Sequence, residues 1–238
     1  MNIAARELGK AAGCETIAIS GVRAVCDQRA ALHFPELDLL VVSDLHLEKG
    51  SSFARRGRLI PPYDTAATLL RLASVVEDYA PRTIVSLGDS FHDGEGAARL
   101  PEPFRDSLLG MMKGRDWFWV AGNHDPDAPD DLPGETVQEL AVGGLVFRHE
   151  PSKGHAEGEV AGHLHPCARI VQRSRSVRRR CFASDGARLV MPAFGAFTGS
   201  LNVLDRAYKG MFRNGAPTAY MIGASRVYPI AGSLLRPG

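Results

Sequence analysis

The sequence predicts an α/β fold, because the two halves of the chain carry different patterns. In the first half, apolar strand-like segments alternate with helical segments, as in βαβ units. In the second half, short strand-like segments follow one another with tight turns, which favours antiparallel pairing. No linker or low-complexity segment separates the halves of this 238-residue chain. We therefore expect a single domain over residues 1–238.

The first half is expected to contain strands over 16–20, 30–34 and 37–44, a helix over 61–79, a strand over 82–89, a helix over 102–112 and a strand over 116–123. Pro61 and Pro62 suit the start of the longer helix, and apolar residues recur three and four positions apart from Leu69 to Tyr79. The second half is expected to contain strands near 136–142, 144–149, 159–165, 168–174, 177–184 and 187–192. Gly143-Gly144 and Asp185-Gly186 mark turns between them.

Composition and targeting signals narrow the class of protein. The net charge of +1 does not by itself indicate a nucleic-acid binder. The chain has no run of 18 apolar residues, so we expect no membrane span, and the first thirteen residues lack the apolar core of a signal peptide. The four cysteines form no CxxC pair. Reduced thiols and a cytoplasmic location are therefore expected.

Polar residues of the types that bind metals follow five of the expected strands. Asp44 and His46 follow the apolar run 39–42 and Ser43. Taken alone, this pair can be an ordinary strand end, because Asp and Ser are common in turns. The other strand ends carry Asp89 with His92, Asn123 with His124 and Asp125, His149, and His163 with His165. Because ligands bind at the carboxyl ends of strands in open α/β sheets, we expect these clusters to meet at one site.

The chemistry of these side chains indicates a metal centre. Carboxylate, imidazole and amide groups together suit Mn, Fe or Zn. One carboxylate among several histidines can bridge two cations, and two cations about 3.5–4 Å apart form the usual site for hydrolysis of phosphate esters. Gly88, Gly122 and Gly162 precede three of the clusters, where a glycine lets the backbone turn close to the ions.

The order of these motifs, DxH, GD, GNHD, H and GHxH over residues 44–165, resembles the calcineurin-like metallophosphoesterases. The stretches SDLHLEKGSSFARRG, GDSFHD, AGHLHP, RRRCF and MPAFGAFTG are similar to the bacterial ligase-associated DNA-damage-response endonucleases of that superfamily, and they extend the resemblance over about residues 39–204. The resemblance implies a four-layer αββα sandwich, with two mixed β-sheets flanked by helices.

The resemblance also implies a role for each cluster. The implied metal ligands are Asp44, His46 and His165 for the first ion, Asp89 as the bridge, and Asn123, His149 and His163 for the second ion. His124 would donate a proton or hydrogen bond to the leaving oxygen, and Asp125 would orient His124. His92 would position the substrate phosphate, as in double-strand-break repair nucleases of the superfamily. The alternative for His92 is a solvent-exposed loop position. Asp93 would pair with His92 or with a loop arginine.

Two arginine runs have two interpretations each. Arg55, Arg56 and Arg58 are expected in a loop near the site, as substrate-binding residues. The second run flanks an expected hairpin and consists of Arg173, Arg175, Arg178, Arg179 and Arg180. Either run can be a solvated surface or a set of contacts to a phosphate backbone. Arginines near a phosphoesterase site can also steer a polyanion towards it.

These features predict a dinuclear-metal phosphoesterase acting on phosphodiester bonds, a DNA endonuclease linked to DNA repair. Mn is the expected metal, with Fe or Zn as alternatives. A phosphatase or small-phosphodiester (nucleotide) hydrolase with the same metal site is the alternative function, since metal ligands carry no substrate identity. A metal-free scaffold is disfavoured because no ligand position is lost.

DNA is the expected partner and no membrane is expected; DNA ligase and helicase partners follow from the resemblance alone. The stretch LVMPAFGAFTGSLNV permits a homo-oligomer without requiring one.

Overall fold

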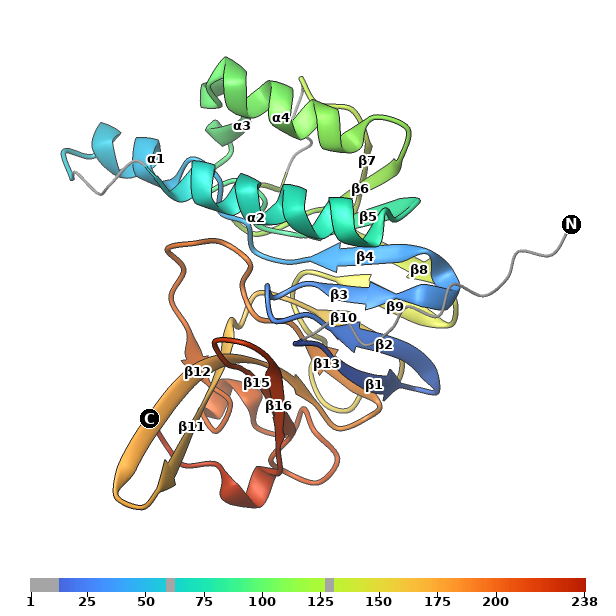
Figure 1. The fold of residues 1–238 in the computed structure, drawn as a ribbon, viewed down its shortest axis with the longest axis vertical. Helices are drawn as coiled ribbons and strands as arrows, with labels where there is room; N and C mark the ends of the chain where they lie inside the picture. Colours follow the sequence, from blue (N-terminus) through green and yellow to red (C-terminus); the bar gives the residue numbers. More distant parts are fainter. Residues whose placement is uncertain (1–12, 59–62, 127–130) are drawn as a thin grey trace, which may run out of the picture.

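Two mixed β-sheets pack face to face in the structure, a computed structural model that describes residues 13–58, 63–126 and 131–238 (Figure 1). The first sheet contains, in spatial order, β1 (Glu15–Ile19), β2 (Val22–Cys26), β3 (Leu32–Phe34), β4 (Leu39–Val42), β5 (Thr83–Leu87), β6 (Asp116–Val120) and β7 (Glu135–Val137). Strands β1 to β4 pair antiparallel, and β4 to β7 pair parallel. The βαβ pattern of the sequence thus forms the parallel half of this sheet.

The second sheet is also mixed. Its strands lie in the order β14 (Leu201–Asn202), β11 (Pro166–Gln172), β12 (Arg175–Ser184), β13 (Arg188–Val190), β10 (Glu159–Ala161), β9 (Leu145–Arg148) and β8 (Glu139–Val142), while β15 (Thr218–Ile222) pairs with β12 and β16 (Val227–Ile230). Strands β9, β10 and β13 are parallel, which corrects the expectation of antiparallel pairing in this half. The cause is the connection 149–158, which returns the chain so that β10 starts at the same end as β9.

Apolar residues on both faces of the central strands explain the layers. In β4, Leu39 and Val41 face the second sheet, whereas Leu40 and Val42 face the helices. A strand that is covered on both sides reads as a continuous apolar run, as this one does. Phe34 and Phe147 meet edge to face between the sheets, with ring centroids 5.6 Å apart. The buried interior therefore lies on both sides of the first sheet.

The helices cover the outer face of the first sheet (Figure 1). They are α1 (Lys49–Arg55), α2 (Asp64–Tyr79), α3 (Gly96–Arg99) and α4 (Glu102–Met112). Leu69, Leu72 and Val76 of α2 are buried in the cluster that also contains Trp117 and Trp119 of β6. Helix α2 ends where the sequence predicts, while the expected start at Pro61 and Pro62 lies outside the described residues. None of the helices in the described ranges is long and apolar enough to cross a membrane.

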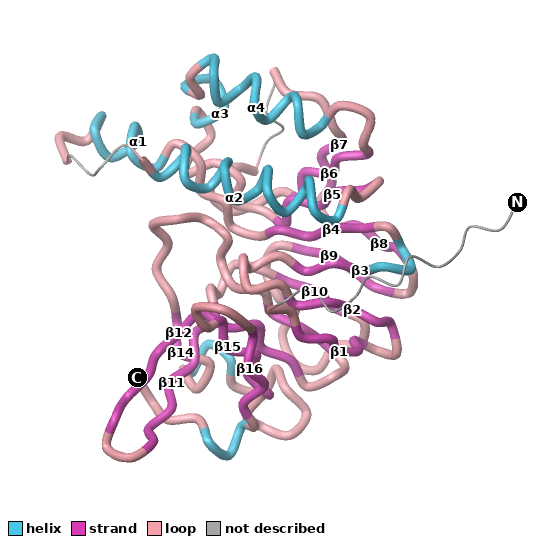
Figure 2. Tube along the Cα trace, viewed as in Figure 1, coloured by secondary structure: helices cyan, strands magenta, loops and turns pink. Residues whose placement is uncertain are grey.

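The outer face of the second sheet carries a different covering. Among the described residues no α-helix lies there; the segment 203–212, with the 3₁₀-helix η2 (Arg206–Tyr208), takes that place (Figure 2). Tyr208 and Phe212 pack over Ala168 and Cys181 of the sheet. The two mixed sheets of the expected sandwich are confirmed, with the α-helices gathered on one side.

One expected strand, over residues 136–142, belongs to both sheets. It divides at Gln138 into β7, which pairs with β6, and β8, which pairs with β9. The chain therefore crosses from the first sheet to the second within a single apolar run. This crossing places the carboxyl end of β9 close to those of β5 and β6, as the short contacts of His149 with Leu87 and Asn123 show.

A buried ion pair links two neighbouring strands of the second sheet. Arg188 of β13 is 0 % exposed, and its guanidinium lies 2.6 Å from the Glu159 carboxylate of β10. Removing one partner leaves an uncompensated buried charge. We expect Arg188→Met to lower the free energy of unfolding by about 3–5 kcal/mol. The exposed Arg82–Asp116 pair provides a control, because Arg82→Met should cost less than about 1 kcal/mol. Urea unfolding measures both, and equal midpoints would contradict the prediction.

Candidate metal centre

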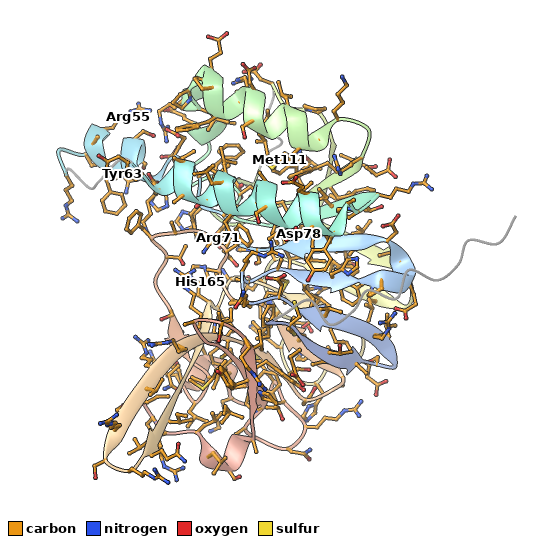
Figure 3. All side chains as sticks on the ribbon, in the orientation of Figure 1. Arg55, Tyr63, Arg71, Asp78, Met111 and His165 are labelled. Atoms are coloured by element: carbon orange, nitrogen blue, oxygen red, sulfur yellow. The ribbon has the colours of Figure 1, made fainter. Side chains whose placement is uncertain are left out.

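The carboxyl ends of five strands from the two sheets converge at one site. Strands β4, β5 and β6 are parallel neighbours, as are β9 and β10. Their ends therefore bring the expected ligands of both sheets to adjacent edges. Figure 3 shows His165 between the helical layer and the β11–β12 hairpin. The arrangement brings together all seven residues for which a ligand role was expected.

Asp44, His46 and His165 form the first group of donors. His165 Nε2 lies 3.0 Å from Asp44 Oδ1. The other oxygen of Asp44 accepts hydrogen bonds from the Ser43 hydroxyl and from the His163 backbone N–H, the latter at 3.1 Å. These bonds fix the carboxylate so that Oδ1 faces the histidines.

Asp89, His149 and His163 form the second group, and Asn123 lies beside it. His149 Nδ1 lies 3.1 Å from the Leu87 carbonyl, which can only accept, so Nδ1 carries a proton. His149 Nε2 lies 2.9 Å from Asn123 Oδ1 and 3.4 Å from Asp89 Oδ1. His163 Nδ1 lies 3.2 Å from the same Nε2. Four donor atoms of metal-ligand type thus converge on one point.

Asp89 lies between the two groups. One of its oxygens, Oδ1, faces His149 of the second group at 3.4 Å, and the other, Oδ2, lies 3.8 Å from His46 Nε2 of the first group. Its side chain is only 3 % exposed. This is the geometry that a carboxylate needs in order to bridge two cations.

Five of the seven residues adopt backbone conformations that are costly for residues other than glycine. They have positive φ angles: Asp44 (53°), His46 (46°), Asp89 (48°), His163 (66°) and His165 (45°). Such conformations cost of order 1–3 kcal/mol each and occur mainly at functional sites. Backbone hydrogen bonds between the strand ends hold them, from Asp44 N–H to Gly88 O and from His46 N–H to Asp89 O. The strand ends therefore stabilise one another in a strained arrangement.

Two glycines permit this close approach. Gly88 has a φ of +75°, and a Cβ at this position would overlap the His149 ring. A Cβ at Gly122 would overlap the Asp89 backbone nitrogen and the carboxylate of Asp125. Any larger residue at these positions must therefore displace a residue of the site.

Burial and charge give the histidines different pKa values. Burial lowers the pKa of His46 and that of His92, each to about 4, and burial with neighbouring His149 lowers that of His163. Burial alone would also lower the pKa of His149, but Asp89 and Asp44 outweigh it and raise the value to about 9. Conversely, burial would raise the pKa of Asp89, and His149 outweighs it and lowers the value. A metal bound among these donor atoms would replace the second proton of His149, the one on Nε2, while Nδ1 keeps its proton.

The polar atoms of the site fit a metal. Asp44 Oδ1 and His165 Nε2 are buried and lie 3.0 Å apart, but not in hydrogen-bond geometry. Neither atom has a hydrogen bond to any other described residue. Buried polar atoms without a hydrogen-bond partner are rare in proteins and indicate a ligand-binding position or a functional group. The donor set of carboxylate, imidazole and amide suits Mn, Fe or Zn. The two groups thus constitute a dinuclear site for divalent metals.

His124 lies at the edge of the site with its side chain 41 % exposed. Its ring stacks on that of His92, with centroids 5.3 Å apart, and it lies 5.3 Å from the His46 ring. His124 Nδ1 lies 3.0 Å from the His92 carbonyl, so Nδ1 donates, and Nε2 lies 4.0 Å from Asp89 Oδ2. The ring therefore presents Nε2 towards the donor groups.

The expected partnership of Asp125 with His124 is corrected by the structure. The Asp125 carboxylate accepts from the Phe91 backbone N–H at 2.9 Å, beneath the loop that follows Asp89. Burial, reinforced by the negative charge of Asp89, raises the pKa of Asp125 to about 7. The backbone carbonyl of His92 orients His124 instead. Asp125 thus supports the loop that carries Asp89.

The remaining expected residues surround His92. His92 is half-buried, and Phe53 of α1 lies 5.5 Å from its ring. Asp93 pairs with Arg99 of α3, at 2.8 Å, rather than with either partner expected for it.

Arg55 and Arg56 line a cavity of about 450 Å³ together with Ser52, Asp93, Gly94 and Glu95. Arg55 forms an ion pair with Glu95, and Arg58 is exposed beyond the end of α1.

Sequence reasoning missed the residues that support the site from behind. Ser43 is fully buried and donates to Asp44; its position directly before Asp44 was the available signal. Arg71 is half-buried and was also missed; it donates to the Phe194 carbonyl. Arg180, expected only as part of the second arginine run, donates to the Ala193 carbonyl of the same segment, whose Gly195 N–H donates to Asp44 O at 3.0 Å. No sequence pattern links Arg71 to the site.

Comparisons with known proteins bear on the same residues. A family model described as calcineurin-like phosphoesterase matches residues 37–180. The crystal structure of Pseudomonas putida nuclease MPE is similar with a TM-score of 0.70 and 26 % sequence identity, covering 92 % of this chain and 100 % of that chain. Yfce, a phosphoesterase from E. coli, has a TM-score of 0.41 and 15 % identity, covering 82 % of this chain and 98 % of its own. No curated protein matches the sequence.

Proposed function

Because its residues 37–180 match the family model, the chain belongs to the calcineurin-like phosphoesterases, and we propose that it is a Mn-dependent DNA endonuclease. As a member of this family it is a metal-dependent phosphoesterase. The proposal concerns the polymer that it cuts and the metal that it uses. The similarity to a Pseudomonas putida nuclease over 92 % of the chain supports a nucleic-acid substrate.

The observation that supports the dinuclear mechanism is the position of Asp89 between two groups of donors, 3.4 Å from His149 and 3.8 Å from His46. In the proposed site, Asp44, His46 and His165 hold one ion, Asn123, His149 and His163 hold the other, and Asp89 bridges them. When bound, two such ions lower the pKa of a coordinated water and neutralise charge on the phosphate.

The residues of the chain supply the rest of the proposed reaction. His124, with Nδ1–H held by the His92 carbonyl, directs Nε2 to the leaving oxygen. In its doubly protonated form it donates the Nε2 proton there and returns to the neutral ring with the proton on Nδ1. His92, stacked beside it, helps to position the phosphate. Arg55 and Arg56, in the adjoining cavity, bind neighbouring phosphates of the strand. Asn123 and His124 are exposed at the edge of the site, where a long chain can reach it.

The alternative is a phosphatase or small-phosphodiester hydrolase that uses the same metals. The two functions are separated by assaying circular single-stranded DNA and supercoiled plasmid with Mn²⁺, alongside a bis-aryl phosphodiester and an aryl phosphomonoester. We expect both circles to be cut, cutting to stop with a chelator, and two metal equivalents per chain to restore it. Turnover of the small esters with intact circles would replace the proposal with the alternative.

A role in DNA repair, with DNA ligase and helicase partners, is proposed on the sequence resemblance alone. A cytoplasmic location is proposed from the cysteine pattern, and a homo-oligomer from the apolar and small residues of the stretch 189–203. Copurification with the ligase and helicase encoded in the source organism tests the partners, and light scattering tests the oligomer. A monomer that binds neither enzyme would remove these parts of the proposal without affecting the nuclease activity.

A further inference from the structure

A long β-hairpin extends directly from the metal centre. Strand β11 begins at Pro166, the residue after His165, and β12 returns antiparallel to it (Figure 2). Between Glu159 and Asp185 the sequence contains no acidic residue. The same stretch contains Arg169, Arg173, Arg175, Arg178, Arg179 and Arg180. We call residues 166–180 the basic hairpin.

The positive charge of the basic hairpin is not neutralised. Arg173, Arg175 and Arg179 are exposed, and in the described parts of the chain no carboxylate lies within ion-pair distance of any of the six arginines. Some exposed arginines elsewhere do have such partners: Arg23 pairs with Glu36, and Arg82 pairs with Asp116. An ordinary solvated surface mixes charges of both signs, and this hairpin does not.

The turn of the basic hairpin places an arginine where the backbone disfavours it. Arg173 and Ser174 have φ angles of 49° and 61° and form a two-residue turn between Gln172 and Arg175. Turns of this kind favour Asn-Gly, because both central residues have positive φ. A strained non-glycine position of this type suggests a function for its side chain. Here the side chain adds a charge at the tip.

The arginines also occupy both faces of the basic hairpin. Arg169 and Arg178 are register partners on one face, whereas Arg175 and Arg179 lie on the other. The second face contains a groove of about 640 Å³ lined by Ile170, Gln172, Arg173, Arg175 and Val177. A strand that covers a protein core has apolar residues on the core face and polar residues on the solvent face. Charge on both faces of the hairpin does not match that alternation.

The base of the basic hairpin is fixed to the metal centre. Arg180 donates to the carbonyls of Ala193 and Gly195, each at 3.0 Å, and Gly195 N–H donates to Asp44 O at 3.0 Å. Arg178 donates to Ser200 O at 2.9 Å. A polyanion bound along the hairpin would therefore be held in a defined position relative to the metal ligands.

We propose that the basic hairpin is an arm that binds the phosphate backbone of nucleic acid beyond the cut site, without sequence preference. The proposal rests on the proposed nuclease function. The seven residues of β11 span about 23 Å at about 3.3 Å per residue. One strand of a duplex carries a phosphate for about every 3.4 Å of axis, so the arm matches the axial length of about seven phosphates of that strand.

The test compares two triple variants that lower the net charge equally, from +1 to −2. The arm variant is R173Q/R175Q/R179Q, and the control is R23Q/R82Q/K113Q, whose residues lie outside the arm. Binding of a fluorescent DNA is titrated over a range of salt concentrations, with cleavage stopped by the Asp89→Asn change. The slope of log K against log salt is negative. For the arm variant we expect its magnitude to decrease by about 2–3, at about 0.7–0.9 per lost phosphate contact. The control should keep the wild-type slope.

Two further variants protect the test against a folding defect. R173N/S174G gives the turn its preferred residues, so it should unfold at the same or a higher temperature. The magnitude of its salt slope should decrease by about 0.7–0.9, because one phosphate contact is lost. R173K/R175K/R179K retains the charge and should retain the slope. With Asp89 intact, every arm variant should hydrolyse the small phosphodiester at the wild-type rate.

The outcomes separate the arm from the nuclease function. An equal decrease in slope magnitude in the arm variant and the control, or an unchanged slope in the arm variant, would overturn the proposal of an arm. So would a change in oligomeric state alone, because it would make the hairpin a contact between copies of the chain. If wild-type protein cuts no DNA and the slope still falls in the arm variant, the nuclease proposal fails while the arm stands as a nucleic-acid binding surface.

Discussion

Asp89→Asn is expected to abolish phosphodiester hydrolysis while leaving the protein folded. The substitution preserves the size of the side chain and removes the charge shared by the two donor groups. Asp89 Oδ1 and Oδ2 face His149 and His46, so an amide at this position offers one oxygen and presents N–H groups to the other side. A loss of about 4 kcal/mol of charge stabilisation in the transition state corresponds to a fall in kcat of about 1,000-fold.

The metal content of the variant gives the second readout. Ligands one step removed from a metal already change its affinity by about 10–100-fold, so the loss of a bridging ligand should reduce occupancy below two ions per chain. Asp27→Asn is the matched control, because Asp27 is equally buried but binds Arg29 and Tyr79 away from the site. The control should keep both ions and full kcat. Two ions and full activity in Asp89→Asn would show that Asp89 is not the bridge.

The residues of the metal centre were predictable from sequence because each follows an apolar strand. An abrupt change from Leu-Val-Val to Ser-Asp-x-His marks the carboxyl end of a buried strand, and parallel strands bring such ends to one edge. The signal is local, but its repetition at five strand ends is what indicates a shared site. The structure places all these side chains within reach of one another.

Elements without a strong period were missed. Helix α1 has only seven residues, fewer than a helical pattern needs to be recognised, and it was interpreted as a loop. Strand β2 was missed although Ser20-Gly21 is a two-residue turn signal between it and β1. The orientation of His124 by a backbone carbonyl could not be predicted, because backbone partners leave no trace in side-chain identity. The Arg188–Glu159 pair depends on strand order, which the local pattern does not determine.

His124→Ala is expected to lower kcat on DNA by about 100- to 10,000-fold, the range of general acid catalysis, with both metals retained. The His124 ring lies at the exposed edge of the site, where Nδ1 is held by the His92 carbonyl and Nε2 is directed inward. Its backbone N–H, which donates to Asp89 Oδ1 at 3.0 Å, remains in the alanine variant. Hydrolysis should therefore be lost without loss of the bridge.

The leaving group distinguishes proton donation by His124 from substrate binding. An alkoxide leaving from DNA needs a proton, whereas an aryl oxide leaving from an activated phosphodiester needs it far less. The fall in kcat should therefore be large on DNA and small on the bis-aryl ester, with His155→Ala, in an exposed loop, unchanged on both. An equal fall on both substrates would mean that His124 binds the phosphate rather than protonates the leaving oxygen. In that case the Nε2 atom 4.0 Å from Asp89 Oδ2 would act on the phosphate oxygens instead.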